Sequence, residues 1–129
     1  MNSKPTEAEL EILQVLWKDG PSTVRAVNEQ LNKMKKVGYT TTLKILQIMT
    51  EKHLVERDEK NRTHIYRASV GQKETLGLLL DKFLNKTFDG SASRMMMHLL
   101  GNHKASAEEI EEIRKLLENI EKENRNGNS

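Results

Sequence analysis

The chain of 129 residues contains no cysteine, only two prolines, and no apolar run long enough to cross a membrane. The missing cysteine excludes disulfides, thiolate metal sites and thiol nucleophiles. A membrane-spanning helix needs roughly 18 to 20 consecutive apolar residues, and the N-terminal residues lack the apolar core of a signal peptide. We therefore expect a cytoplasmic protein, and the scarcity of proline leaves most of the chain free to form helices.

Side chains that carry catalysis or hold metals are scattered through this sequence. The histidines are His53, His64, His98 and His103. None of them stands in an H-E-x-x-H or related spacing, and the chain has neither a G-x-S-x-G serine nor a glycine-rich phosphate loop. The acidic run at 108–112 fits the start of a helix, where the helix dipole favours negative charge. We predict no enzymatic activity, no catalytic residue, no metal site and no cofactor.

Positive charge gathers in one part of the chain. Residues 1–70 contain 12 basic and 9 acidic side chains, whereas residues 71–129 contain 9 and 10. Between Lys33 and Arg67 there are 9 basic and 4 acidic residues. Such a concentration is expected of a surface that binds phosphate groups, and a solvated basic surface on an ordinary domain is the alternative.

The first half of the chain predicts two helices before a third. The first begins at Thr6, because Glu9 three residues later completes a capping box, and it ends at Gly20. The second runs from about Thr23 through a basic run to Gly38, which terminates it. Its apolar face is predicted to comprise Val24, Val27, Leu31 and Met34.

A third helix, capped by Thr40 or a neighbour and reaching about Lys52, is followed by two short β-prone segments. These segments, 54–57 and 64–67, flank a polar turn and predict a hairpin. A coil or a longer helix over 51–61 is the alternative, but it leaves the second segment without a partner. Two helices, a third helix and a β-ribbon are the order of a winged helix-turn-helix, which places the third helix in the DNA major groove.

Candidate DNA-contacting residues follow from the face of the third helix that points away from the core. The candidates on this helix are Thr40, Thr41, Lys44, Gln47 and Ile48, and those in the turn of the hairpin, the wing, are Lys60 and Arg62. Threonine hydroxyls bond phosphate oxygens near a helix N-terminus. Lysine reaches a guanine edge or a phosphate, glutamine pairs with adenine, and isoleucine meets a thymine methyl. The alternative is that each is an ordinary surface residue.

The C-terminal half predicts three further helices, at 71–88, at 92–100, and from a capping box formed by Ser106 and Glu109. This half is too short to bury a stable core alone, so we predict that it packs against a second copy of the chain. The candidate dimerisation residues are Leu79, Phe83, Met96, Ile110, Ile113, Leu117 and Ile120. Folding back onto the N-terminal domain of the same chain is the alternative.

The expected fold class is mainly α with a small β-hairpin. It comprises an N-terminal winged helix-turn-helix over residues 1–70 and a helical dimerisation domain over 71–123. Residues 124–129 are expected to form a disordered tail.

Four motifs in this order resemble the penicillinase-repressor family of BlaI/MecI-type regulators. They are AELEILQVLW at 8–17, YTT…L at 39–46, EKHLVERD at 51–58 and EEIEEIRKLLENI at 108–120. The resemblance implies a winged helix, a helical dimerisation domain, and repression by occupying palindromic operators. Many members are released when a membrane-embedded sensor metallopeptidase triggers cleavage between the dimerisation helices. Staphylococcal-type members are cut at an Asn-Phe bond, and the matching position here is His98-Leu99.

Copper-responsive relatives carry a C-terminal cysteine cluster, so the absence of cysteine excludes copper sensing of that type. Taken together, the residues and the resemblance predict a homodimeric repressor of a double-stranded DNA operator. A winged-helix module that binds other proteins, without sequence-specific DNA binding, is the alternative that exposure of Leu43 or Ile48 leaves open.

Overall fold

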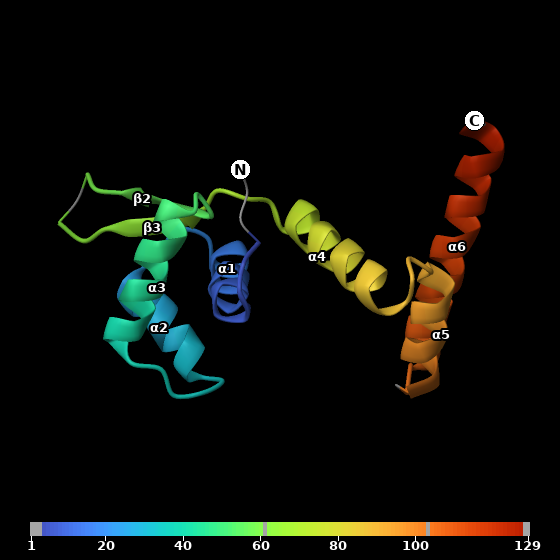
Figure 1. The fold of residues 1–129 in the computed structure, drawn as a ribbon, viewed down its shortest axis with the longest axis horizontal. Coiled ribbons are helices and arrows are strands. Elements are labelled where there is room, and N and C mark those ends of the chain that lie inside the picture. The colour runs from blue at the N-terminus through green and yellow to red at the C-terminus, as the bar shows by residue number, and fades with distance from the viewer. Residues whose placement is uncertain (1–3, 61, 103, 128–129) are drawn as a thin grey trace. The chain divides into compact units, whose positions relative to one another are not determined.

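The computed structural model describes residues 4–60, 62–102 and 104–127 (Figure 1). The elements in chain order are α1 (Glu7–Asp19), β1 (Ser22–Thr23), α2 (Val24–Asn32), α3 (Tyr39–Glu51), β2 (Val55–Asp58), β3 (Ile65–Ala68), α4 (Gln72–Thr87), α5 (Ala92–Asn102) and α6 (Ala107–Gly127). The chain divides into two compact units between Asp81 and Lys82, within α4. In the described part of the chain, no helix is long and apolar enough to span a membrane.

Helix α1 begins and ends where local sequence signals place it. The Thr6 hydroxyl accepts a hydrogen bond from the Glu9 amide at 3.2 Å, and a Glu9 carboxylate oxygen accepts one from the Thr6 amide at 2.9 Å. Gly20 follows the helix with φ +83°, a conformation that side chains disfavour. The predicted capping box and the predicted stop of the first helix are confirmed.

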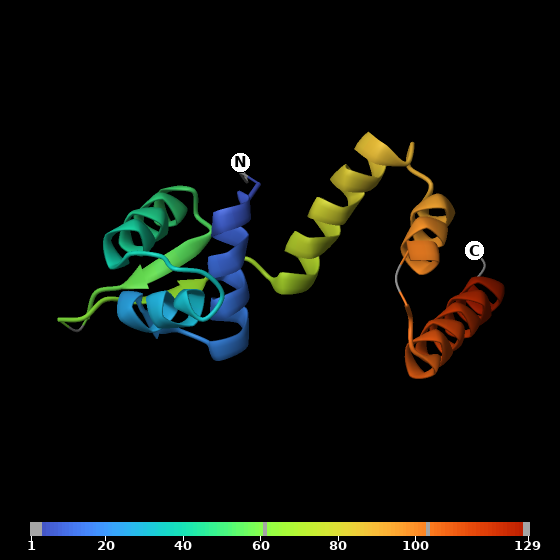
Figure 2. The same cartoon turned by 90° about the horizontal axis from the view of Figure 1, so that it is seen from below.

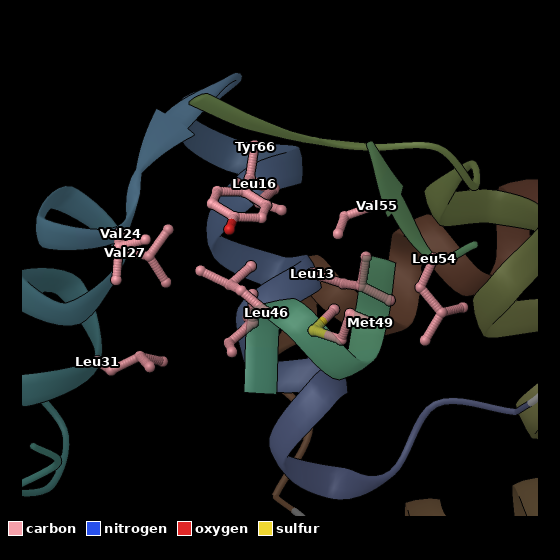
Figure 3. Close-up of a cluster of buried hydrophobic side chains, with 11 residues drawn as sticks. Leu13, Leu16, Val24, Val27, Leu31, Leu46, Met49, Leu54, Val55 and Tyr66 are labelled. Atoms are coloured by element: carbon pink, nitrogen blue, oxygen red, sulfur yellow. The ribbon is translucent and has the colours of Figure 1, made fainter. Parts of the chain in front are cut away.

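The core of the first unit lies where α1, α2, α3 and the hairpin meet (Figure 3). Its buried side chains are Ile12, Leu13, Leu16, Val24, Val27, Leu31, Leu46, Met49, Leu54, Val55 and Tyr66. Each helix contributes residues at intervals of three or four, which places them on one face. The same spacing leaves the opposite face of α3 free of core contacts.

Helix α2 is shorter than predicted, and two expectations at its end are wrong. It ends at Asn32, and the Asn32 side chain then accepts a hydrogen bond from the Val37 amide at 3.1 Å and donates one to the Val37 carbonyl at 2.9 Å. The basic run therefore lies in a turn, and Met34 is 80% exposed instead of belonging to the apolar face. Gly38 does not terminate α2 but precedes α3, which begins at Tyr39, so Thr40 is not its cap.

The predicted hairpin is confirmed, with each strand beginning one residue later than expected. β2 pairs with β3 antiparallel, with Val55 opposite Ala68 and Asp58 opposite Ile65. β1, which the sequence did not predict, pairs with the other edge of β3, giving the order β1-β3-β2. In both views of the fold, the hairpin extends beyond α2 and α3 (Figures 1 and 2).

The predicted C-terminal helices form, with different ends. Helix α5 continues through Gly101 to Asn102, and α6 continues to Gly127, so the tail expected to be disordered from 124 is helical as far as 127. Residues 128–129 lie outside the described residues. The capping box of α6 is present: the Ser106 hydroxyl accepts from the Glu109 amide, and Glu109 accepts from the Ser106 amide, both at 3.1 Å. The predicted domain boundary at 70/71 stays a prediction.

Candidate nucleic-acid interface

Helix α3 presents two faces of opposite character. Thr42, Leu46 and Met49 are fully buried. The predicted DNA-contacting residues of this helix, Thr40, Thr41, Lys44, Gln47 and Ile48, are all exposed. Among the described residues, none of these five side chains forms a hydrogen bond or an ion pair. A row of uncommitted polar side chains on one helix face suits contacts with a ligand outside the chain.

A polar network that the sequence did not reveal holds the start of α3 against α2. The Asn28 side chain donates hydrogen bonds to the Val37 carbonyl at 3.0 Å and to the Thr42 hydroxyl at 2.9 Å. The Thr42 hydroxyl in turn donates to the Gly38 carbonyl at 3.3 Å. Because Thr42 is buried, each of these groups would be costly to leave unpaired. The network therefore sets the direction in which α3 leaves the turn.

An ion pair holds the other end of α3. Lys52, which follows the last residue of α3, places its Nζ 2.7 Å from Glu9 Oε1 and 3.0 Å from Glu9 Oε2. Glu9 is only 4% exposed, and it is also the residue that closes the capping box of α1. One carboxylate thus joins the beginning of α1 to the end of α3.

The basic side chains of the wing divide into paired and unpaired groups. Arg57 pairs with Glu59 at 2.6 Å, and Arg67 pairs with Glu56 at 2.9 Å. The hydrogen bond to Glu59 raises the pKa of Arg57 above its ordinary value. The predicted contacts Lys60 and Arg62 form no ion pair within the described part of the chain. They are therefore the wing cations that remain available to an external anion.

A solvent-open hollow of about 580 Å³ lies between the start of α2, the start of α3 and the wing. The described residues that line it are Thr23, Val24, Arg25, Tyr39, Leu43, Arg62, Thr63, His64 and Tyr66. Arg25 is a basic residue of this surface that sequence reasoning missed. The only signal for it was its place in the first turn of α2, because the first helix of a helix-turn-helix crosses the DNA backbone.

This arrangement, a helix-turn-helix followed by a wing, agrees with the comparison to known proteins. The family described as penicillinase repressor matches residues 5–119, most of the chain. The chain belongs to the penicillinase repressor family. The family comprises transcriptional repressors with a winged-helix DNA-binding fold and is not a class of enzymes.

Relatives within the family are similar over nearly their full length. A penicillinase repressor of Bacillus licheniformis is 27% identical over 113 residues, covering 88% of each chain. The transcriptional regulator BlaI of Mycobacterium tuberculosis is 29% identical over 117 residues, covering 89% of this chain and 83% of the relative. A solution structure of the DNA-binding domain of the repressor BlaI matches with a TM-score of 0.50 at 22% identity, covering 57% of this chain and 93% of that chain. The winged-helix fold class is thereby confirmed.

The predicted dimerisation residues of this family member fall into two groups. Phe83, Ile110, Leu117 and Ile120 are between 42% and 56% exposed. Leu79, Met96 and Ile113 are half-buried. Among the described residues, neither α5 nor α6 contains a buried side chain. The apolar faces of these helices are therefore largely open to solvent in the single chain.

The predicted cleavage position lies inside α5. His98 and Leu99 are both exposed, and His98 Nε2 is 3.0 Å from the Asn102 side-chain nitrogen. The His98 ring also packs beside Phe88, with centroids 5.8 Å apart. The bond between His98 and Leu99 is thus held in a regular helical turn. Of the remaining histidines, His103 lies outside the described residues.

Proposed function

We propose that this protein is a homodimeric repressor whose two α3 helices enter successive major grooves of a pseudo-palindromic operator. The observation that carries the proposal is the exposed face of α3, where Thr40, Lys44 and Gln47 are free of partners in the described chain. Lys44 and Gln47 have the chemistry to bond guanine and adenine edges. The unpaired Lys60 and Arg62 of the wing would contact the backbone beside the groove. Such a regulator would act in the cytoplasm.

The second copy is the partner that best accounts for α5 and α6. Exposed apolar surface of this extent is costly in water and marks an interaction site. On α6, Ile110, Ile113, Leu117 and Ile120 follow the spacing of a coiled-coil seam. A dimer would place two winged helices at the fixed separation that a symmetric operator requires. The tether also raises the effective concentration of the second winged helix once the first has bound.

Release would follow from loss of that tether. The family resemblance makes cleavage at His98-Leu99 by a membrane sensor metallopeptidase part of the proposal. Both side chains are exposed, but their bond lies in α5, so α5 must unwind locally before a peptidase can bind it in an extended form. Membranes from the host, prepared with and without inducer, would be incubated with the protein. The expected product is a fragment that ends at His98, identified by mass spectrometry.

The test of DNA recognition is an unbiased selection. Purified protein would be mixed with sheared genomic DNA from its own host, and the recovered fragments would be sequenced. We expect an inverted repeat in a promoter. Lys44→Ala should lose selectivity for this repeat, whereas Lys73→Ala, the same change in the first turn of α4, should keep it. Recovery of featureless DNA by the unchanged protein would instead favour a module that binds other proteins.

A further inference from the structure

The hollow beside α3 concentrates unopposed positive charge. Arg25 comes from α2 and Arg62 from the wing, 37 positions later in the sequence, yet both line the same cavity of about 580 Å³. None of the described lining residues is acidic. Neither arginine has a carboxylate partner in the described part of the chain. In contrast, Arg57 and Arg67 of the same wing are each neutralised by a glutamate.

The other lining groups complete a site for an oxyanion. Tyr39 is 50% exposed and, with Thr63, offers a hydroxyl donor. The buried Val24 and Tyr66 line it as well and exclude water on that side, which strengthens charge interactions. Guanidinium groups bind phosphate oxygens through two parallel N–H donors. The chemistry of the lining therefore matches a phosphate group better than a neutral or cationic ligand.

The location of the hollow identifies where the phosphate comes from. Tyr39 and Leu43 lie on α3 one turn apart, on the flank between its buried side and its exposed side. When the exposed side enters a major groove, a backbone strand must pass along a flank of the helix. The hollow lies on the flank that faces the wing. A DNA phosphodiester would reach it without any further movement of the chain.

We propose that this hollow seats one phosphate of the operator backbone, held jointly by Arg25 and Arg62. The proposal rests on the function proposed above and adds to it a contact from α2 that couples the wing to the helix-turn-helix. Because both cations would serve one phosphate, their contributions should overlap. Loss of both should remove one phosphate contact, not two.

The experiment measures operator affinity of the full chain as a function of salt concentration. The variants are Arg25→Gln, Arg62→Gln and the double variant. The matched control is Arg67→Gln, which removes the same charge from the same wing but from an arginine that Glu56 already neutralises. Inorganic phosphate is titrated separately into the free protein, and the arginine side-chain resonances are followed by NMR.

We expect Arg25→Gln to weaken operator binding about tenfold or more, as for loss of a charged hydrogen bond, and Arg67→Gln to change it little. The double variant should lose less than the product of the single losses. Its salt slope should fall by about 0.9 in total, the value for one phosphate, and two separate phosphates would give about 1.8. Free phosphate should bind only in the millimolar range.

Three results would overturn the inference while leaving the repressor proposal intact. They are normal binding by Arg25→Gln, a slope change of about 1.8 in the double variant, and saturation of the hollow by micromolar inorganic phosphate, which would identify a small-anion site. Failure of the unchanged protein to select any operator is a different result, and it would refute both proposals.

Discussion

Removal of the Lys52 ammonium tests how the recognition helix is anchored. Lys52→Met keeps most of the apolar stem but leaves the Glu9 carboxylate, 5% exposed, with the Thr6 amide as its remaining hydrogen-bond donor in the described chain. Breaking a fully buried pair costs roughly 3 to 5 kcal/mol because an uncompensated charge stays behind. The Lys52 side chain is 24% exposed, so water reaches this carboxylate from one side. We therefore expect a loss of about 2 kcal/mol.

The single tryptophan of the chain makes this loss measurable for the winged-helix unit alone. Trp17 lies in α1, and its indole nitrogen donates a hydrogen bond to the Val70 carbonyl at 2.9 Å. Its fluorescence therefore reports the unfolding of that unit. A loss of 2 kcal/mol should lower the urea midpoint by about 1 M and the melting temperature by roughly 8 to 16 °C.

Glu9→Gln provides the control for this reasoning. Glutamine keeps an oxygen that accepts from the Thr6 amide but carries no charge, and Lys52 can then extend into water. In that background, Lys52→Met should cost about 0.5 kcal/mol or less, since no carboxylate is stranded. If Lys52→Met costs the same with and without the charge at position 9, the buried carboxylate is not the cause and the argument is refuted.

Three other substitutions test separate parts of the molecule. Leu117→Glu should convert the protein to a monomer in sedimentation experiments, because it places a charge on the apolar face of α6, whereas Asn119→Glu should leave a dimer; a dimeric Leu117→Glu would contradict the assembly. Asn28→Ala should cost about 1 to 3 kcal/mol in urea unfolding, because the buried Thr42 hydroxyl loses its donor; an unchanged midpoint would mean that water replaces the amide. Thr6→Ala should cost about 1 kcal/mol in the same assay through loss of the α1 cap, and a Thr6→Ser variant that loses as much would argue against the hydroxyl.

The exposed face of α3 could be predicted from the sequence because it depends on helix geometry alone. Once 39–51 is a helix, the burial of Thr42, Leu46 and Met49 turns the opposite side chains outward. The ends of α3 and α2 were less predictable. The turn between them depends on side-chain bonds from Asn28 and Asn32 to a residue several positions later, and no propensity scale describes such bonds.

The sequence by itself determined the features that depend on neighbours three or four residues apart. These include the capping boxes of α1 and α6, the stop at Gly20 and the alternation that forms the hairpin. Only the tertiary structure decided which distant residues meet. The two-residue strand β1 exists because β3 offers it an edge, Glu9 meets Lys52 because α1 packs against α3, and Arg25 meets Arg62 because the wing folds back beside α2. Local hydrogen bonds form within one turn of chain, whereas these contacts require packing of the whole unit, so no short window of sequence contains them.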